Sequence, residues 1–272
     1  MEEKLPIREA AARLAAEGLD FFTPEDLEKW FGIGRRKAYD LAQRMTKANV
    51  TRRVKGGFYA LLPPADWLDR EGFAVNWYWM AANIMREDPY FIAYYTAMDI
   101  HQMTQHPVLT VFVATPRRHK DLTVGPARLR FVTVTVARLF GAETRRFEGN
   151  PVNVADLERT FLDGVDRMRL CGGLEEVARG FDRRHRDLDR EKLLRYVLQF
   201  DSPVVAKRLG FLLELVGHGD VFLLRDLERL TPRLKRYVPL DPGRDPEANE
   251  RNRRWELDVN TDIEKLVQGL RT

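Results

Sequence analysis

Cysteine is nearly absent from this sequence. Cys171 is the single cysteine among 272 residues, so an intrachain disulfide and a cysteine-rich zinc site are excluded, and a reducing compartment is indicated. No run approaches the roughly 18 apolar residues of a membrane-spanning helix. Acids rather than an apolar segment follow Met1, so no signal peptide is expected. These features predict a cytoplasmic protein.

Several sequence signatures of enzymes are also missing. The chain has no Walker-type phosphate loop and no dinucleotide fingerprint, and its five histidines show no metal-ligand spacing. It contains no internal repeat and no low-complexity segment. We therefore expect no cofactor, no metal and no catalytic residue.

The composition is that of a globular protein with a real core. Hydrophobic residues make up 44% of the chain and aromatic residues 10%, and the formal net charge is +4. At this length the chain has room for one large domain or two ordinary ones. The pair Pro63-Pro64 interrupts regular secondary structure, so we place a domain boundary there and expect domains at 1–64 and 65–272.

The first 64 residues have the order of a winged helix-turn-helix. A helix is expected over 5–17, with Ala11, Leu14 and Ala15 on its inner face. Thr23 is a good N-cap for the next helix, with Pro24 at its first position. The inner faces of the second and third helices are expected at Leu27, Trp30 and Phe31, and at Ala38, Leu41, Ala42 and Met45.

Glycines supply the two turns of this domain. Gly32 and Gly34 surround Ile33 and allow the sharp turn between the second and third helices. Gly56-Gly57 closes a hairpin between strands expected at 51–54 and 58–61.

Charge is placed in this domain as duplex DNA would require. Residues 1–34 hold eight acids and four bases, whereas residues 35–55 hold eight bases and one acid, Asp40. Such a basic patch is attracted by phosphates, and its arginines and glutamine can read base edges in the major groove. The candidate DNA-binding residues are Arg35, Arg36, Lys37, Tyr39, Gln43, Arg44 and Lys47 on the third helix, and Arg52, Arg53 and Lys55 on the wing. The alternative is a winged domain that only docks protein.

The remainder of the chain favours an α+β domain, with strands first and helices after. The aromatic residues Trp67, Phe73, Trp77, Tyr78 and Trp79 are interpreted as core of this second domain. A helix capped at Thr96 is expected within 89–105. Strands are expected at 108–115, 122–124, 129–136 and 144–147, and helices at 154–168, 174–181, 190–200, 203–216 and 222–230. The segment 241–254 is interpreted as a loop, followed by an edge strand at 255–259 and a helix at 262–270.

Candidate reactive residues have structural alternatives. His101 is interpreted as a hydrogen-bonded, partly buried side chain rather than a catalytic one, because Asp99 lies two residues away and does not face it on a helix. Cys171 is interpreted as a packed residue, since no base lies near it in sequence. His119 and the basic run 183–186 are interpreted as solvated, with an anion or nucleic-acid contact as the alternative.

The helix over 154–168 carries charges that can pair. Arg159 and Asp163 stand at i and i+4, which predicts a structural ion pair that fixes the helix against the sheet. A functional surface at Glu158 and its neighbours is the alternative. Glu191-Lys192 could belong to a metal-dependent nuclease, but no upstream acid on a matching strand accompanies it.

Four blocks of the sequence resemble the AbiEi family of antitoxins. Residues 91–101 resemble the family's "sALslHG" block, although His101 is followed by Gln102 instead of the usual glycine. The second block is similar to the "ERTllD…GGleev" signature and contains Glu158, Arg159, Asp163, Gly172 and Gly173. Residues 208–214 resemble the "RLGyLlE" helix, and Trp255 and Asn260 stand at the family's closing "W…N" strand.

The resemblance implies a function in bacterial abortive infection, a form of phage defence. Members of this family are the antitoxins of type IV toxin–antitoxin systems. Their winged domain represses the operon's own promoter at inverted repeats, and the C-terminal domain counters a nucleotidyltransferase-like toxin without needing a tight complex. The partners expected are therefore double-stranded DNA and such a toxin, with the chain a monomer or weak dimer that pairs on DNA.

Three hypotheses follow from the sequence. The first is a transcriptional regulator and antitoxin that is not an enzyme. The second is a nuclease or nucleotide-processing enzyme tethered to DNA, in which Asp99, His101 or Glu158 would be essential. The third is a protein-docking adaptor without salt-sensitive affinity for DNA.

Overall fold

The chain folds into two compact units in the computed structural model. The structure describes residues 5–68, 76–124, 127–217, 220–245 and 250–270. Unit 1 comprises residues 1–84 and 122–127, and unit 2 comprises 85–121 and 128–272. The fold class is α+β, as expected, with an N-terminal winged helix-turn-helix followed by strands and then helices. Among the described residues, every helix is too short or too polar to cross a lipid bilayer.

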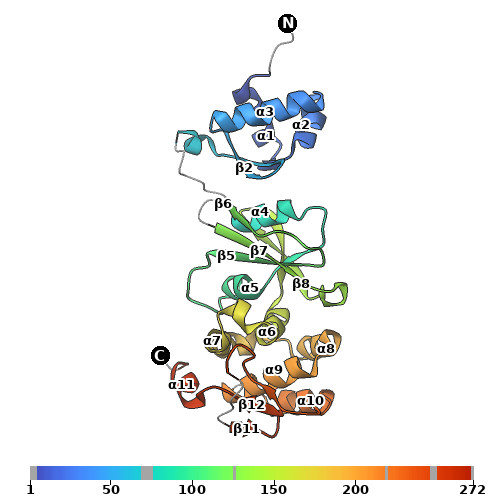
Figure 1. Cartoon of the computed structure of the whole chain (residues 1–272), viewed down its shortest axis with the longest axis vertical. Coiled ribbons are helices and arrows are strands. Elements are labelled where there is room, and N and C mark those ends of the chain that lie inside the picture. The colour runs from blue at the N-terminus through green and yellow to red at the C-terminus, as the bar shows by residue number, and fades with distance from the viewer. Residues whose placement is uncertain (1–4, 69–75, 125–126, 218–219, 246–249, 271–272) are drawn as a thin grey trace. The chain divides into compact units, whose positions relative to one another are not determined.

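Unit 1 contains the winged helix-turn-helix (Figure 1). Three helices, with the short strand β1 between the first two, pack with a three-stranded sheet in which β3 lies between β1 and β2. The elements are α1 (Ile7–Ala16), β1 (Phe21–Phe22), α2 (Pro24–Phe31), α3 (Arg35–Lys47), β2 (Thr51–Lys55), β3 (Phe58–Leu61), a 3-10 turn (Pro64–Trp67) and α4 (Trp77–Ile84). The hairpin is confirmed, and β1 is a strand that the sequence reading missed.

The second and third helices of the winged domain begin where the sequence predicts, whereas the first begins at Ile7 instead of residue 5. Thr23 caps α2 through a capping box, in which its hydroxyl accepts from the Asp26 amide while the Asp26 carboxylate accepts from the Thr23 amide. Gly32 ends α2 with a φ of 60°, a conformation that favours glycine. Gly34 is the N-cap of α3 with a φ of −71°, so only the first of the two glycines supplies left-handed backbone.

The core of the winged domain differs from the prediction at three positions. All four inner residues of α3 are buried, as predicted, and so is Leu27. On α1, however, Ala10 is buried and Ala15 is exposed, because the buried stripe runs through positions 10, 11 and 14. Trp30 is 50% exposed and is not a core residue.

The aromatic segment after the wing was wrongly assigned to the second domain's core. Trp67 packs against the core of the winged domain, and its indole N–H donates to the Leu62 carbonyl. The Asn49 amide donates to the carbonyls of Asp66 and Trp67 and holds the turn in place. The three aromatic residues at the start of α4, Trp77, Tyr78 and Trp79, are only half-buried. Phe73 lies outside the described residues.

Unit 2 holds most of a mixed sheet, whose strand at residues 122–124 falls in unit 1, together with a helical layer and a small second sheet (Figure 1). The six-stranded sheet has the order β6-β7-β5-β4-β9-β8, and the small one β10-β12-β11. The strands are β4 (Phe91–Ile92), β5 (Thr110–Thr115), β6 (Leu122–Val124), β7 (Ala127–Thr133), β8 (Ala142–Phe147), β9 (Asn150–Ala155), β10 (Val238–Pro239), β11 (Glu250–Asn252) and β12 (Leu257–Val259). The α-helices are α5 (Tyr94–Ile100), α6 (Leu157–Asp166), α7 (Leu174–Arg184), α8 (Arg190–Phe200), α9 (Pro203–Leu215), α10 (Val221–Leu230) and α11 (Ile263–Gln268).

Strand β9 contradicts the start of the helix expected over 154–168, since the chain is a strand through Ala155 and α6 begins at Leu157. It pairs antiparallel with β8 from Phe147 opposite Asn150 to Ala142 opposite Ala155. On its other side it meets β4 at one position only, Ile92 opposite Val154. Pro151 is therefore tolerated, because that end of β9 is not paired with β4.

Three smaller expectations for unit 2 are corrected. Helix α5 has Ala93, not Thr96, as its N-cap; the Thr96 hydroxyl instead donates to the Thr110 carbonyl and accepts from the Phe112 amide, which ties α5 to β5. Strand β7 ends at Thr133 and a 3-10 turn follows (Val136–Arg138). Strand β12 is the middle strand of its sheet rather than an edge strand, because β11 falls inside the expected loop.

Candidate nucleic-acid interface and buried motif residues

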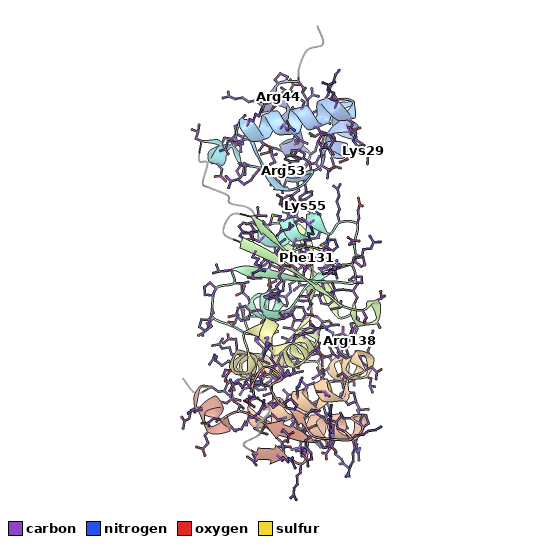
Figure 2. The ribbon with its side chains drawn as sticks, in the orientation of Figure 1. Lys29, Arg44, Arg53, Lys55, Phe131 and Arg138 are labelled. Carbon is purple, nitrogen blue, oxygen red and sulfur yellow. The ribbon has the colours of Figure 1, made fainter. Side chains whose placement is uncertain are left out.

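Helix α3 presents a basic face opposite its buried stripe. Arg35, Arg36, Lys37, Gln43 and Lys47 are exposed. Tyr39 and Arg44 are half-buried, and Figure 2 labels Arg44 on α3. The structure thus brings the predicted α3 residues together on one surface that faces solvent.

The predicted cations of α3 differ in how strongly neighbouring groups hold them. Arg44 donates to the Asp40 carboxylate at 3.0 Å and to the Leu5 carbonyl at 3.4 Å, so its guanidinium is partly engaged. Arg35 lies over the Tyr39 ring at 6.0 Å and 4.0 Å from Glu25. A hydrogen bond with Tyr39 and the charge of Glu25 raise the pKa of Arg35. Among the described residues, Arg36 has no ion pair or hydrogen-bond partner.

The wing carries the remaining predicted cations (Figure 2). Arg53 is exposed, whereas Arg52 and Lys55 are partly buried, and the strand register shifts between Arg53 and Lys55. The Lys55 ammonium lies 5.8 Å from the centre of the Phe58 ring. The wing therefore presents one exposed guanidinium beside two partly buried cations.

The predicted ion pair of α6 is present and fully buried. Arg159 Nε donates to Asp163 Oδ1 at 2.9 Å, and both side chains are 1% exposed. Arg159 Nη1 also donates to the carbonyls of Arg138 and Phe140 at 2.6 and 3.1 Å, which join the segment after β7 to α6. Burial raises the pKa of Asp163, and Arg159 opposes that shift. Arg159 is thus a structural residue, as predicted.

Glu158 belongs to a second polar cluster that sequence reading did not assemble. Lys192 Nζ lies 2.8 Å from Glu158 and 3.1 Å from Asp156. The Tyr196 hydroxyl donates to Asp156, and the Asp189 amide donates to Glu158. Burial lowers the pKa of Lys192, but its bonds to the two carboxylates outweigh this and raise it overall. The i+4 spacing of Lys192 and Tyr196 places both side chains on one face of α8, but it does not show which acids they meet.

His101 is buried and hydrogen-bonded, as predicted. Its Nε2 lies 2.7 Å from the Ala155 carbonyl and its Nδ1 lies 3.1 Å from Arg145 Nη2. Because an arginine donates only, Nδ1 accepts and Nε2 carries the proton, so the ring is neutral. Burial is the main reason why the pKa of His101 is lowered.

The other reactive candidates are engaged or inaccessible. Cys171 is fully buried, and burial raises the pKa of its thiol well above the ordinary value. His119 lies 3.1 Å from Asp88, and Arg184 pairs with Asp187 at 2.9 Å. Within the described ranges, no group of three or more His, Cys, Asp or Glu side chains is arranged to hold a metal ion.

Steric constraints explain why glycine occupies positions 172, 173 and 210 in the blocks that resemble the antitoxin family. Gly172 and Gly173 both have a positive φ, 82° and 93°, and a Cβ on Gly172 would lie 3.0 Å from both Glu176 and Tyr95. A Cβ on Gly210 would lie 2.2 Å from the Trp255 ring, which is fully buried. The Trp255 indole donates to Glu214 at 2.5 Å. Helix α9 and the turn before β12 thus pack closely against each other at one glycine.

The last motif residues also hold the scaffold. Arg208 is buried and donates to the Pro239 carbonyl at 2.8 Å. The Asn260 carboxamide accepts from the Asp241 amide and donates to the Asp241 and Asp245 carbonyls. The polar residues shared with the antitoxin blocks therefore lie mostly inside unit 2, where they join helices to loops.

Comparison with solved structures shows a similarity in fold. The chain resembles the crystal structure of the RV2827C protein from Mycobacterium tuberculosis with a TM-score of 0.69, over 97% of this chain and 94% of that one. The two sequences are 13% identical, so the similarity concerns the fold. No protein-family model matches the sequence, and no curated protein matches it.

Proposed function

We propose that this chain is a DNA-binding transcriptional repressor and antitoxin of the AbiEi kind. The winged domain binds inverted repeats in its own promoter, with α3 in the major groove and the β2–β3 wing against the neighbouring phosphates. The C-terminal domain counters a nucleotidyltransferase-like toxin. The chain acts in the cytoplasm and catalyses no reaction.

The exposed basic face of α3 is the observation that supports this proposal most. Its cations lie on a helix whose opposite face is anchored by four buried side chains, so they are displayed on a rigid element. Rigid display suits major-groove recognition, since base contacts depend on side-chain position. The antitoxin half of the proposal is supported by the four sequence blocks.

The test uses the full-length chain and its own upstream DNA. We expect a salt-dependent shift of that duplex, weakened by about 1–3 kcal/mol for each of Arg35 and Arg36 that reads a base. The double variant Arg8→Ala with Lys29→Ala removes two exposed cations from α1 and α2 and is the matched control. An unchanged shift in the Arg35→Ala, Arg36→Ala variant would refute the assignment, and no salt-sensitive affinity at all would favour the protein-docking adaptor.

The antitoxin role is tested by co-expression with the neighbouring gene. We expect a nucleotidyltransferase-like reading frame there, whose growth arrest is relieved by this chain. The Arg35→Ala, Arg36→Ala variant should still relieve the arrest while it loses repression of the promoter. Loss of both together would contradict the proposed division of labour.

The enzymatic hypothesis makes the opposite prediction. It requires turnover of DNA, RNA or nucleotides that Asp99, His101 or Glu158 variants abolish. In the structure, His101 is neutral with both ring nitrogens bonded, and Glu158 is paired with Lys192. If the wild-type protein turns over DNA, RNA or nucleotides and these variants do not, the enzymatic hypothesis would be supported and our proposal would be wrong.

A further inference from the structure

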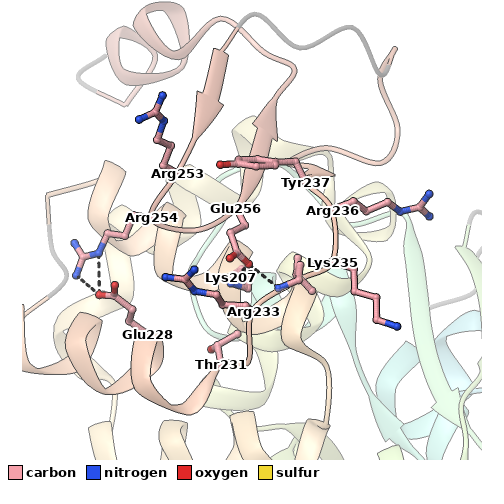
Figure 3. Close-up of a pocket in the computed structure, with 11 residues that line it drawn as sticks. Lys207, Glu228, Thr231, Arg233, Lys235, Arg236, Tyr237, Arg253, Arg254 and Glu256 are labelled. Atoms are coloured by element: carbon pink, nitrogen blue, oxygen red, sulfur yellow. Dashed lines mark hydrogen bonds and ion pairs between the residues drawn. The ribbon is translucent and has the colours of Figure 1, made fainter.

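A basic pocket lies in unit 2, between α9, α10, the segment 231–237 and the turn that joins β11 to β12 (Figure 3). Its volume is about 340 Å³. Six bases and two acids line it, together with a tyrosine, a leucine and a threonine. A concave surface with this excess of positive charge concentrates the field that attracts an anion.

The two acids of the pocket are already neutralised. Glu256 lies 2.6 Å from the buried Lys207 ammonium and also accepts from the Leu234 amide at 2.7 Å. The hydrogen bond from Lys207 is the main reason why the pKa of Glu256 is lowered. Glu228 is paired with Arg254 at 3.2 Å. These pairs fix the floor of the pocket. The charge of Arg233 also helps to lower the pKa of Glu256, whereas Lys235, Arg236 and Arg253 have no acid partner among the residues that line the pocket.

Four exposed bases remain around the opening. Arg233, Lys235, Arg236 and Arg253 form no hydrogen bond or ion pair with any residue in the described part of the chain. In Figure 3, Arg233 points toward Glu256, whereas Lys235 and Arg236 point away from the cluster. The free charges are thus spread along the rim rather than gathered on one point, which suits several phosphates better than a single small anion.

An aromatic ring completes the rim. Tyr237 is half-buried, and the Arg251 guanidinium lies 5.3 Å from the centre of its ring. Aromatic and guanidinium planes beside a basic groove are the surfaces on which unpaired bases stack. The pocket is of the size of a small-ligand site, so it admits a single splayed nucleotide, whereas a duplex offers no free base to enter it.

We propose that this pocket binds single-stranded nucleic acid, with phosphates on Arg233, Arg236 and Arg253 and one base against Tyr237. This site goes beyond the proposed function, because its residues differ from those of α3 and the wing. It would give the C-terminal unit a nucleic-acid partner that is independent of promoter binding.

The test measures binding of labelled oligouridylate and oligothymidylate to the full-length chain at several salt concentrations. The triple variant Arg233→Ala, Arg236→Ala, Arg253→Ala should bind at least tenfold more weakly. Its salt slope should fall by about 2, since each phosphate contact on a single strand contributes about 0.7. The matched control, Arg118→Ala with Lys120→Ala and Arg186→Ala, removes three exposed bases of the same unit that do not line the pocket.

Stacking of a base on Tyr237 can be tested separately from the phosphate contacts, with the same binding measurement. Tyr237→Leu should weaken binding by about fivefold or more, whereas Tyr237→Phe should retain it. Tighter binding of oligouridylate or of oligothymidylate would show whether the pocket prefers RNA or DNA. Equal loss in the pocket and control triples would overturn the proposal, as would equal competition by polyglutamate, which would indicate an acidic protein partner.

The two sites can fail separately. The pocket triple should still shift the promoter duplex, and the Arg35→Ala, Arg36→Ala variant should still bind the single strand. If the α3 variant alone abolishes oligonucleotide binding, the single strand is bound by the winged domain and the pocket has no such role.

Discussion

The charged residues that stand out in the sequence have opposite fates in the two units. In the winged domain, Arg35 and Arg36 lie in solvent on a helix whose other face is buried. In unit 2, Arg159 and Arg208 lie in the interior, where they donate to carboxylate and carbonyl oxygens. The same residue type therefore faces solvent in one unit and holds the scaffold together in the other. Substitutions should separate these two uses by their effect on the free energy of unfolding.

Arg159→Met should have the largest effect. It leaves Asp163 buried without its cation, and loss of one partner of a buried pair costs about 3–5 kcal/mol. Chemical denaturation at neutral pH measures the loss. The double change Arg159→Met with Asp163→Leu should regain much of the stability, because no charge is then left alone. A loss below about 1 kcal/mol in the single variant would contradict a structural role.

Gly210→Ala should come next, with a loss of about 1–3 kcal/mol from overpacking. The added methyl meets the buried ring of Trp255, which has no room to move. Thermal unfolding followed by tryptophan fluorescence reports both the loss and any shift of that ring. Gly269→Ala is the control, because its nearest neighbour would lie at an ordinary 3.4 Å. Equal behaviour of the two variants would argue against a tight fit.

His101 should make stability depend on pH. Its folded pKa lies below the unfolded value, so the folded state resists protonation. The contribution is complete above the unfolded pKa near 6.5 and is lost as the pH falls, by at most about 1.4 kcal/mol per pH unit. Unfolding curves between pH 7.5 and 5 measure it. His101→Gln should flatten the dependence, and an unchanged pH dependence in that variant would contradict this assignment.

Arg35→Ala with Arg36→Ala should have the smallest effect on folding, within about 0.5 kcal/mol, as is usual for surface positions. The same variant should nevertheless lose affinity for promoter DNA. Measuring stability and duplex binding on one preparation makes the comparison between units direct. A large loss of stability would show that these arginines are structural after all.

Local rules predicted the winged domain well because its signals are short-range. The capping box at Thr23, the glycine at 32 and the stripe through Met45 each depend on residues within one or two turns. Strand β1 was missed because two residues give no periodicity; it exists because β3 offers it a partner. Trp30 was wrongly predicted to be buried, because helical periodicity gives the face of a residue but does not show whether a neighbouring helix extends far enough to cover it.

Unit 2 was harder to predict because its contacts join distant segments. The i+4 spacing was enough to predict the pair of Arg159 and Asp163. The pairing of Lys192 with Asp156 and Glu158 spans more than thirty residues and has no signature in the sequence. The basic pocket likewise gathers Lys207, Arg233 and Arg253 from three separate elements. Strand β9 was missed because Pro151 ordinarily argues against a strand.

The fit between Gly210 and Trp255 determines how this protein can be dissected. Trp255, which lies near the C-terminal end of the chain, packs against α9 at Gly210. A fragment that stops before Trp255 would therefore expose this part of α9 to water. Such a fragment would be prone to proteolysis and self-association, and its failure to protect cells would reveal nothing about toxin recognition. Activity should therefore be mapped with point changes on the outside of the molecule, not by shortening its tail.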